Sequence, residues 1–337
     1  MIKGLGTLRA AALPLLSFAM AAAFPAYARE SESVRAELSP MSRVPALRSG
    51  ADTTEDGRVF GGREAAKGAW PFQVALLTSA MLDNSADSQL NAQFCGGSLI
   101  APQWVLTAAH CLYDYGDAIA PDSVTVLTEA TDLREGVRFA VEQVFMHEGY
   151  DPSTLDNDIG LLKLAAPASA GTIAMTDTDM ESGSTTVIGW GMMEDGTFPI
   201  ALMEADLDLQ ANQACNAGIK EIYARDLGDV LRNFSVRMRY SEGAVEEATK
   251  AIAATMRDPL TPNMLCAGIQ TGARDACNGD SGGPLFTMKD GKPVQVGIVS
   301  WGEGPMDAGA ACGHENAYGI YTRLANYRGW ISQKTGL

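Results

Sequence analysis

From Trp70 onward the chain consists of short runs in which apolar and polar side chains alternate, and turn-forming residues separate the runs. Such alternation is typical of half-buried strands, because successive side chains of a strand point to opposite faces of the sheet. The runs are Phe72–Leu77, Ser98–Ile100, Trp104–Leu106, Val124–Leu127, Phe139–Phe145, Ile159–Leu164, Thr185–Ile188, Val294–Ser300 and Tyr318–Thr322. Many short strands at this spacing predict an all-β sandwich or barrel.

Two segments interrupt the strand pattern. Residues 216–258 favour a helical insertion, because Val245, Ala248 and Ile252 recur near helical spacing between charged residues. We interpret the insertion as an amphipathic surface element, and a role in gating or partner binding is the alternative. Residues 324–335 predict a C-terminal helix.

The first 28 residues are typical of a secretory signal peptide. Lys3 and Arg9 give a basic start, the apolar run Ala10–Phe24 follows, and the segment Ala26–Ala28 supplies a small-x-small cleavage site. The alternative, a membrane anchor, is disfavoured because prolines break the apolar run. Export would make disulfides available to the six cysteines. The cysteines allow many pairings, and none shows the CxxC spacing of a zinc or redox site.

Residues 29–58 are polar and lack apolar periodicity, so they predict a disordered segment. The segment ends at Arg58, and Val59 is followed by Phe60 and two glycines. An exposed arginine before such a sequence indicates a proteolytic cleavage site, and an ordinary linker is the alternative.

The composition limits the function classes. The net charge is −16, with 20% charged and 46% apolar residues in 337. This charge argues against nucleic acid as a partner, because phosphate binding needs a basic face. It fits the attraction of cationic substrates.

A candidate nucleophile lies in the stretch Asp275–Pro284, where Ser281 stands among glycines directly after Asp280. A serine hydroxyl is a poor nucleophile unless a base activates it. His110 follows an apolar strand, and Asp158 opens another. The three residues form a candidate Ser-His-Asp set of nucleophile, base and orienting acid.

The segment Gly279–Gly283 also satisfies G-x-S-x-G, the nucleophile elbow of α/β-hydrolases. That esterase interpretation requires the order serine, acid, histidine, with His314 as the base, and a helix directly after the serine. Pro284 stops such a helix, so this alternative is disfavoured.

From Val59 to the C-terminus the chain resembles the trypsin-type serine endopeptidases, which have the chymotrypsin fold. The matching motifs are Val59–Gly62, Cys95–Ile100, Leu106–Cys111, Asn157–Ile159, Gly189–Gly191, Gly279–Pro284 and Val299–Gly302. The resemblance implies a peptidase domain over 59–337 with two six-stranded antiparallel β-barrels. The first barrel would span about 70–170 and the second about 180–323, with the helical insertion in the second.

The resemblance also assigns catalytic roles. His110 would take the proton of Ser281, and Asp158, bonded by Ser300, would orient His110. The backbone N–H groups of Gly279 and Ser281 would form the oxyanion hole.

Substrate selection would depend on Asp275, which resembles the acid at the base of the S1 pocket in trypsin-like members. Gly302 and Gly319 match the glycines that leave this pocket open, and Ser300 lies on its wall. Ala276 stands where many trypsins have serine, so we expect a preference for arginine, whose guanidinium binds a carboxylate bidentately, over lysine.

Activation would follow cleavage of the Arg58–Val59 bond, so that 29–58 is a pro-segment. The new amine of Val59 would pair with Asp280, which resembles the family's activation switch. Because the bond follows arginine, either another protease or the enzyme itself could cut it.

The resemblance selects the disulfide pairs Cys95–Cys111, Cys215–Cys266 and Cys277–Cys312. It leaves two departures from small trypsins: the helical insertion and the long loop 302–311. The family's calcium loop is poorly matched at 128–136, and we interpret Glu129, Asp132 and Glu135 there as solvated acids. We expect no required cofactor or metal, with sodium near Tyr318 as an alternative.

We expect a secreted monomer, extracellular or periplasmic, that acts on proteins or peptides with Arg or Lys at the cleaved bond. Protein inhibitors are further expected partners, and nucleic acid and membrane are not. A catalytically inactive homologue that serves as a binding module is the alternative from a different class, and the presence of Ser281, His110 and Asp158 disfavours it.

Overall fold

The computed structural model describes residues 39–50, 53–54, 61–272, 274–306 and 312–337. The predicted signal peptide and the predicted Arg58–Val59 cleavage site lie outside these residues. Within the described part of the chain, no helix combines the length and apolar character needed to cross a membrane.

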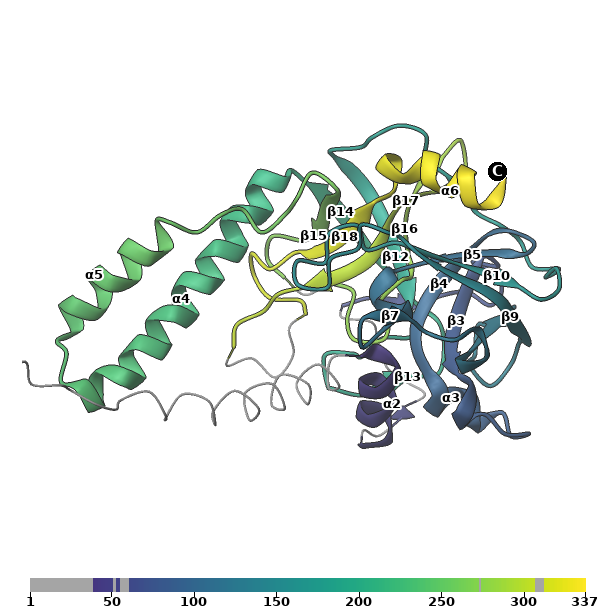
Figure 1. Cartoon of the computed structure of the whole chain (residues 1–337), viewed down its shortest axis with the longest axis horizontal. Helices are drawn as coiled ribbons and strands as arrows, with labels where there is room; N and C mark the ends of the chain where they lie inside the picture. Colours follow the sequence, from purple (N-terminus) through teal and green to yellow (C-terminus); the bar gives the residue numbers. More distant parts are fainter. Residues whose placement is uncertain (1–38, 51–52, 55–60, 273, 307–311) are drawn as a thin grey trace, which may run out of the picture. The chain divides into compact units, whose positions relative to one another are not determined.

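Six strands of the N-terminal half close into an antiparallel barrel in the spatial order β10-β5-β4-β3-β8-β9 (Figure 1). They are β3 (Gln73–Thr78), β4 (Gln93–Ala101), β5 (Trp104–Thr107), β8 (Val124–Thr128), β9 (Val137–Met146) and β10 (Gly160–Leu164). The runs predicted between Phe72 and Leu164 all fall within or beside these strands.

The second barrel follows the order β17-β16-β12-β14-β15-β18, and β18 pairs back with β17 to close it. Its strands are β12 (Gly183–Gly189), β14 (Met203–Gln210), β15 (Met264–Gly268), β16 (Pro284–Lys289), β17 (Lys292–Gly302) and β18 (Gly319–Arg323). Strand β11 (Ala174–Met175) pairs with β17, and β2 (Arg63–Glu64) pairs with β14. The predicted all-β class with two six-stranded barrels is confirmed.

Short elements fill the connections. Strand β1 (Thr53–Thr54) pairs with β13 (Phe198–Pro199), and β6 (Tyr113–Asp114) pairs with β7 (Asp117–Ala118). The short helices are η1 (Ser79–Met81), α3 (Asp87–Ala92), η2 (Ala109–Leu112) and η3 (Pro121–Ser123). The predicted C-terminal helix appears as η4 (Leu324–Tyr327) followed by α6 (Arg328–Thr335).

Aromatic side chains join the two barrels. Phe72 precedes β3, Phe286 lies in β16, and both are buried. The Phe286 ring centroid lies 5.5 Å from that of Phe72 and 4.7 Å from that of Trp70. The largest core cluster therefore contains residues of both barrels, and it holds the facing strands together.

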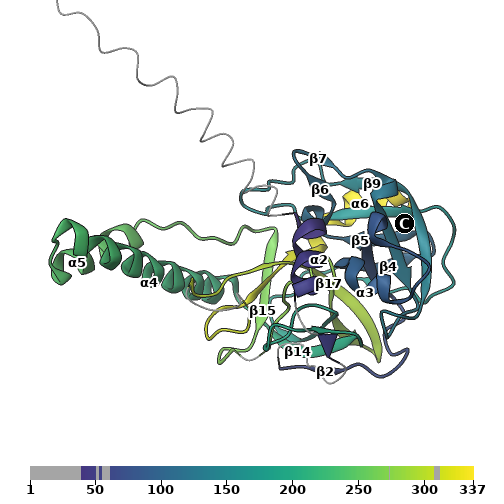
Figure 2. The ribbon, with the colours of Figure 1, turned by 90° about the horizontal axis from the view of Figure 1, so that it is seen from below.

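The helical insertion is a pair of helices, α4 (Asn212–Met238) and α5 (Glu242–Ala253). They lie side by side and extend away from the strands of the second barrel (Figures 1 and 2). The disulfide Cys215–Cys266 ties the start of α4 to β15. Of the predicted apolar face of α5, Val245 is buried and Ile252 is 46% exposed, so this face packs only in part.

The prediction of disorder for 29–58 was wrong for the stretch that the structure describes. Residues Pro40–Gly50 form helix α2, which packs against β4. Val44 is 1% exposed, and Arg48 is also buried. The helix shows no amphipathic periodicity in its sequence, so its burial depends on a fitted surface of the barrel that a local pattern does not reveal.

The contact between the barrels gives a stability prediction. Phe286→Ala should lower the free energy of unfolding by about 3–5 kcal/mol, because it leaves a cavity between Trp70 and Phe72. Urea titration would measure this loss. The matched control is Phe234→Ala on α4, where the ring is 59% exposed, and the change should stay within about 0.5 kcal/mol. Equal losses in the two variants would contradict the proposed role of Phe286.

Candidate active site

The predicted Ser-His-Asp residues come together from both barrels. His110 lies in η2, directly after β5, and Asp158 stands just before β10. Ser281 lies in the turn before β16 of the second barrel, and Ser300 lies in β17. The site therefore exists only when the two barrels are packed together.

Asp158 is the best-connected group of the site, with 1% of its surface exposed. Its Oδ2 lies 2.7 Å from His110 Nδ1, and its Oδ1 accepts the His110 backbone N–H at 2.8 Å. The Ser300 hydroxyl donates to Oδ2 at 2.5 Å. A carboxylate at Nδ1 favours the tautomer that carries its proton there, so Nε2 is left as the basic nitrogen.

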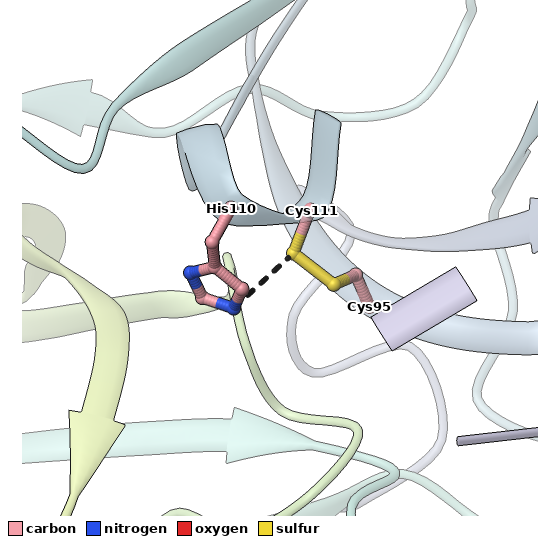
Figure 3. A group of neighbouring side chains, drawn as sticks. All are labelled: Cys95, His110 and Cys111. Atoms are coloured by element: carbon pink, nitrogen blue, oxygen red, sulfur yellow. Dashed lines mark hydrogen bonds between the residues drawn. A yellow bond between two sulfur atoms is a disulfide. The ribbon is translucent and has the colours of Figure 1, made fainter. Parts of the chain in front are cut away.

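His110 Nε2 faces the disulfide between Cys95 and Cys111 and lies 3.8 Å from Cys111 Sγ (Figure 3). Because both sulfurs are oxidised in this disulfide, they cannot act as thiolate ligands. The group of Cys95, His110 and Cys111 is therefore not a metal site. Among the described residues, no hydrogen bond joins Nε2 to Ser281 Oγ. Such bonds are often long before substrate binds and shorten in the complex.

The turn around Ser281 presents two unpaired donors. Gly279 has φ +103°, a backbone conformation that favours glycine. The next two glycines have hydrogen-bonded N–H groups. The Gly282 N–H donates to the Val299 carbonyl oxygen at 2.8 Å, and the Gly283 N–H donates to that of Asp280 at 2.9 Å. Within the described part of the chain, no acceptor binds the N–H groups of Gly279 and Ser281, which are the two donors predicted to form the oxyanion hole.

Asp275, the predicted acid of the S1 pocket, is buried and only 2% exposed. It accepts the Ala276 N–H at 2.8 Å and the Gly313 N–H at 3.2 Å. Burial raises the pKa of Asp275 to about 7. A Cβ on Gly319 would lie 2.5 Å from Asp275 Oδ1, whereas one on Gly302 would be 4.0 Å from Oδ2. A side chain at position 319 would therefore clash with the Asp275 carboxylate, whereas one at position 302 would not.

Asp280 is also buried, behind the Ser281 turn. It accepts the Gly191 N–H at 2.7 Å and the Cys277 N–H at 2.9 Å. Burial raises the pKa of Asp280 to about 6, against the opposing effects of these bonds and of the Arg48 charge. Arg48, which comes from α2, was not identified from the sequence.

Sequence reasoning also missed two contacts from α4 to the loop 302–311. The Tyr223 hydroxyl donates to Glu303 Oε1 at 2.7 Å, and Asp226 Oδ2 accepts the Met306 N–H at 3.1 Å. Tyr223 and Asp226 are three residues apart, so they lie on one face of the helix. This spacing was the available signal, but it did not identify their partner. The middle of α4 thus holds Glu303 and Met306, which follow β17.

The remaining predicted residues lie around the site or away from it. The three disulfides join Cys95–Cys111, Cys215–Cys266 and Cys277–Cys312, which are the pairs that the resemblance implied. Asp132 pairs with Arg134 and Glu135 pairs with Lys67, so both acids have cationic partners. Glu129 accepts a hydrogen bond from Ser169.

The buried state of Asp275 gives a pH prediction. An aspartate in an unfolded chain titrates near pH 3.9, so the folded state holds this proton more tightly up to about pH 7. Ionisation of Asp275 therefore opposes folding increasingly as the pH rises through this window. We expect the Tm of Asp275→Ala, relative to the wild type, to rise between pH 5 and pH 8 in thermal unfolding.

The control for this prediction is Asp195→Ala. Hydrogen bonds from Thr197 lower the pKa of Asp195, so its stabilising effect is lost only at pH values below about 4. The relative Tm of this variant should stay constant between pH 5 and pH 8. A constant relative Tm for Asp275→Ala as well would show that Asp275 does not titrate in that range.

Comparison with known proteins identifies the family. The trypsin family model matches residues 59–229 and 217–331. Transmembrane protease serine 11B of Homo sapiens is 32% identical over 290 residues, which cover 83% of this chain and 56% of that protein. Vitamin K-dependent protein C of Oryctolagus cuniculus is 32% identical over 280 residues, which cover 82% and 52%.

Mannan-binding lectin serine protease 1 of Mus musculus is 31% identical over 303 residues, which cover 83% of this chain and 36% of that protein. The chain spans little more than half the length of the first curated relatives that it matches. Since the family model accounts for both barrels and for the turn that carries Ser281, the chain belongs to the trypsin family.

Proposed function

We propose that this chain is the secreted precursor of a serine endopeptidase that hydrolyses peptide bonds after arginine or lysine. The observation that carries the proposal is the Asp158–His110 pair beside Ser281, with two unpaired N–H donors on the Ser281 turn. Nucleophile, base, orienting acid and oxyanion donors are thus present in one place.

In the proposed reaction, Ser281 Oγ attacks the substrate carbonyl carbon while His110 Nε2 accepts the hydroxyl proton. The N–H groups of Gly279 and Ser281 stabilise the negative charge on the carbonyl oxygen. The imidazolium then gives its proton to the leaving amine, and an acyl-enzyme ester remains on Ser281. Water, activated by His110, releases the acid and restores the serine. All of these groups belong to the protein, so the proposed reaction needs no cofactor.

The choice of substrate follows from Asp275. A buried carboxylate with two backbone N–H donors still lacks a cation among the described residues. A substrate guanidinium or ammonium would supply that charge. Ala276 offers no hydroxyl to an ammonium, whereas a guanidinium can bind both oxygens of Asp275, so the proposal favours arginine.

Activation is proposed to follow cleavage after Arg58. The freed amine of Val59 would pair with Asp280, whose carboxylate lies directly behind the oxyanion-hole turn. A cation at this point would favour the ionised carboxylate and thereby stabilise the turn that it supports.

The proposed function can be tested by labelling Ser281 with a fluorophosphonate. The chain that begins at Val59 should be labelled and should hydrolyse an arginine amide, and Ser281→Ala should abolish both. The full-length Arg58→Gln precursor should be secreted but react far more slowly. An unlabelled Val59 chain would rule out the peptidase proposal, and rapid labelling of the Arg58→Gln precursor would rule out activation by this cleavage.

Specificity can be tested by amidine binding and by paired substrates. Benzamidine needs an ionised Asp275, so its affinity should fall about tenfold per pH unit below about pH 7. Neutral benzamide, of the same shape, should show no such decrease. Peptide pairs that differ only in Arg or Lys should give a higher kcat/KM for Arg. Equal kcat/KM values would contradict the role given to Ala276.

A further inference from the structure

Arg48 is an arginine held inside the protein, with 2% of its surface exposed. It lies near the end of α2 and reaches the second barrel. Its Nη2 donates to the Trp190 carbonyl oxygen at 2.6 Å and to Gln93 Oε1. Its guanidinium carbon lies 4.3 Å from the centroid of the Phe198 ring, which is a cation–π distance. The guanidinium is therefore held by a carbonyl, an amide and an aromatic face.

These partners belong to the wall behind the oxyanion-hole turn. Gln93 Nε2 donates to the Gly279 carbonyl oxygen at 2.8 Å. Trp190 precedes Gly191, whose N–H donates to Asp280 Oδ1 at 2.7 Å. The Arg48 site and Asp280 thus share a wall, although the described residues form no direct ion pair between the two.

The Arg48 charge acts on Asp280 across this wall. It lowers the pKa of Asp280, while the Asp280 charge in turn raises that of Arg48. Burial outweighs both effects, and the pKa of Arg48 is lowered to about 9. Asp275 and Tyr321 are the other titratable groups that interact with Asp280. Among the described residues, Arg48 is thus the cation whose charge acts on Asp280.

The fit of Arg48 is incomplete. Its Nε and Nη1 are buried without a hydrogen-bond partner in the described structure, and such donors are costly. A site selected only for packing would favour an apolar side chain of similar length. Arg43, on the same helix, also reaches this region and donates to Asn278 Oδ1 at 2.7 Å. Both arginines of α2 therefore contact the surroundings of the Ser281 turn.

We propose that Gln93, Trp190 and Phe198 form a guanidinium-binding site beside Asp280, which Arg48 fills in the uncleaved precursor. Arg48 then serves as the counter-ion of Asp280 until cleavage, and α2 is bound to the barrels through this site. The activation step of this inference rests on the proposed function, whereas the binding site itself does not.

The site has a consequence for activation. Residues 29–58 contain no cysteine, so after cleavage only non-covalent contacts hold this segment to the barrels. The Val59 amine would bring a second positive charge to the buried Asp280 carboxylate, whose single negative charge can neutralise only one cation. The two cations repel each other in this poorly solvated place, so arrival of the amine favours release of α2.

The binding site can be tested by a double-mutant cycle in the Arg58→Gln precursor. The variants are Arg48→Met, Asp280→Asn and both together, with Arg43→Met as the control on the same helix. We expect Arg48→Met to lower Tm by about 4 °C more when Asp280 is present than in the Asp280→Asn background. Arg43→Met should lower Tm equally in both backgrounds. Additive shifts for Arg48 and Asp280 would overturn the proposal.

A second measurement covers the case in which Asp280→Asn does not fold. An arginine-specific protease cleaves the wild-type and Arg48→Met precursors, and cleavage and fluorophosphonate labelling are followed together. Labelling should lag behind cleavage in the wild type and follow it more closely in Arg48→Met, because α2 leaves sooner. Equal lags would overturn the proposal. Absence of labelling in both would instead reject the peptidase function, and the site would then be decided by whether Arg48→Met lowers the Tm of the precursor more than Arg43→Met does.

Discussion

The hydrogen bonds of Asp158 are the interaction on which the site depends. Its carboxylate is hydrogen-bonded to the ring and the backbone N–H of His110, from the first barrel. It also accepts a hydrogen bond from the Ser300 hydroxyl, from the second. The backbone carbonyl oxygen of Asp158 accepts a hydrogen bond from the Thr322 hydroxyl at 2.6 Å. A buried carboxylate is tolerated only when such partners surround it. The same contacts therefore fix the histidine and join the barrels.

Three buried aspartates of the candidate site show three ways to meet this requirement. Asp158 is satisfied by donors from both barrels. Asp275 has two backbone donors and no cationic partner among the described residues, and burial raises its pKa. Asp280 has two backbone donors and the distant charge of Arg48. Incomplete solvation of Asp275 and Asp280 reduces stability, and in the proposed enzyme it supplies specificity and activation.

The strands named from the sequence were found, and β14 was missed although Ala205, Leu207 and Leu209 alternate there with two aspartates. The segment Met203–Gln210 forms β14, although Glu204 is buried among its apolar residues and no strand was predicted there. Trp70 donates to Glu204 at 2.7 Å, and Arg63 pairs with it. Because these partners come from distant segments, no local pattern shows that the acid can face inward.

The sequence alone determined the fold class and identified the candidate Ser-His-Asp residues and Asp275, because each depends on local periodicity or on motif residues. Tertiary structure decided what α2 and α4 contact. The disordered segment predicted before Val59 contains a packed helix, and Arg48 reaches Trp190. Tyr223, on α4, donates to Glu303. These partners are separated widely along the chain, and only the closed barrels bring them within hydrogen-bond distance.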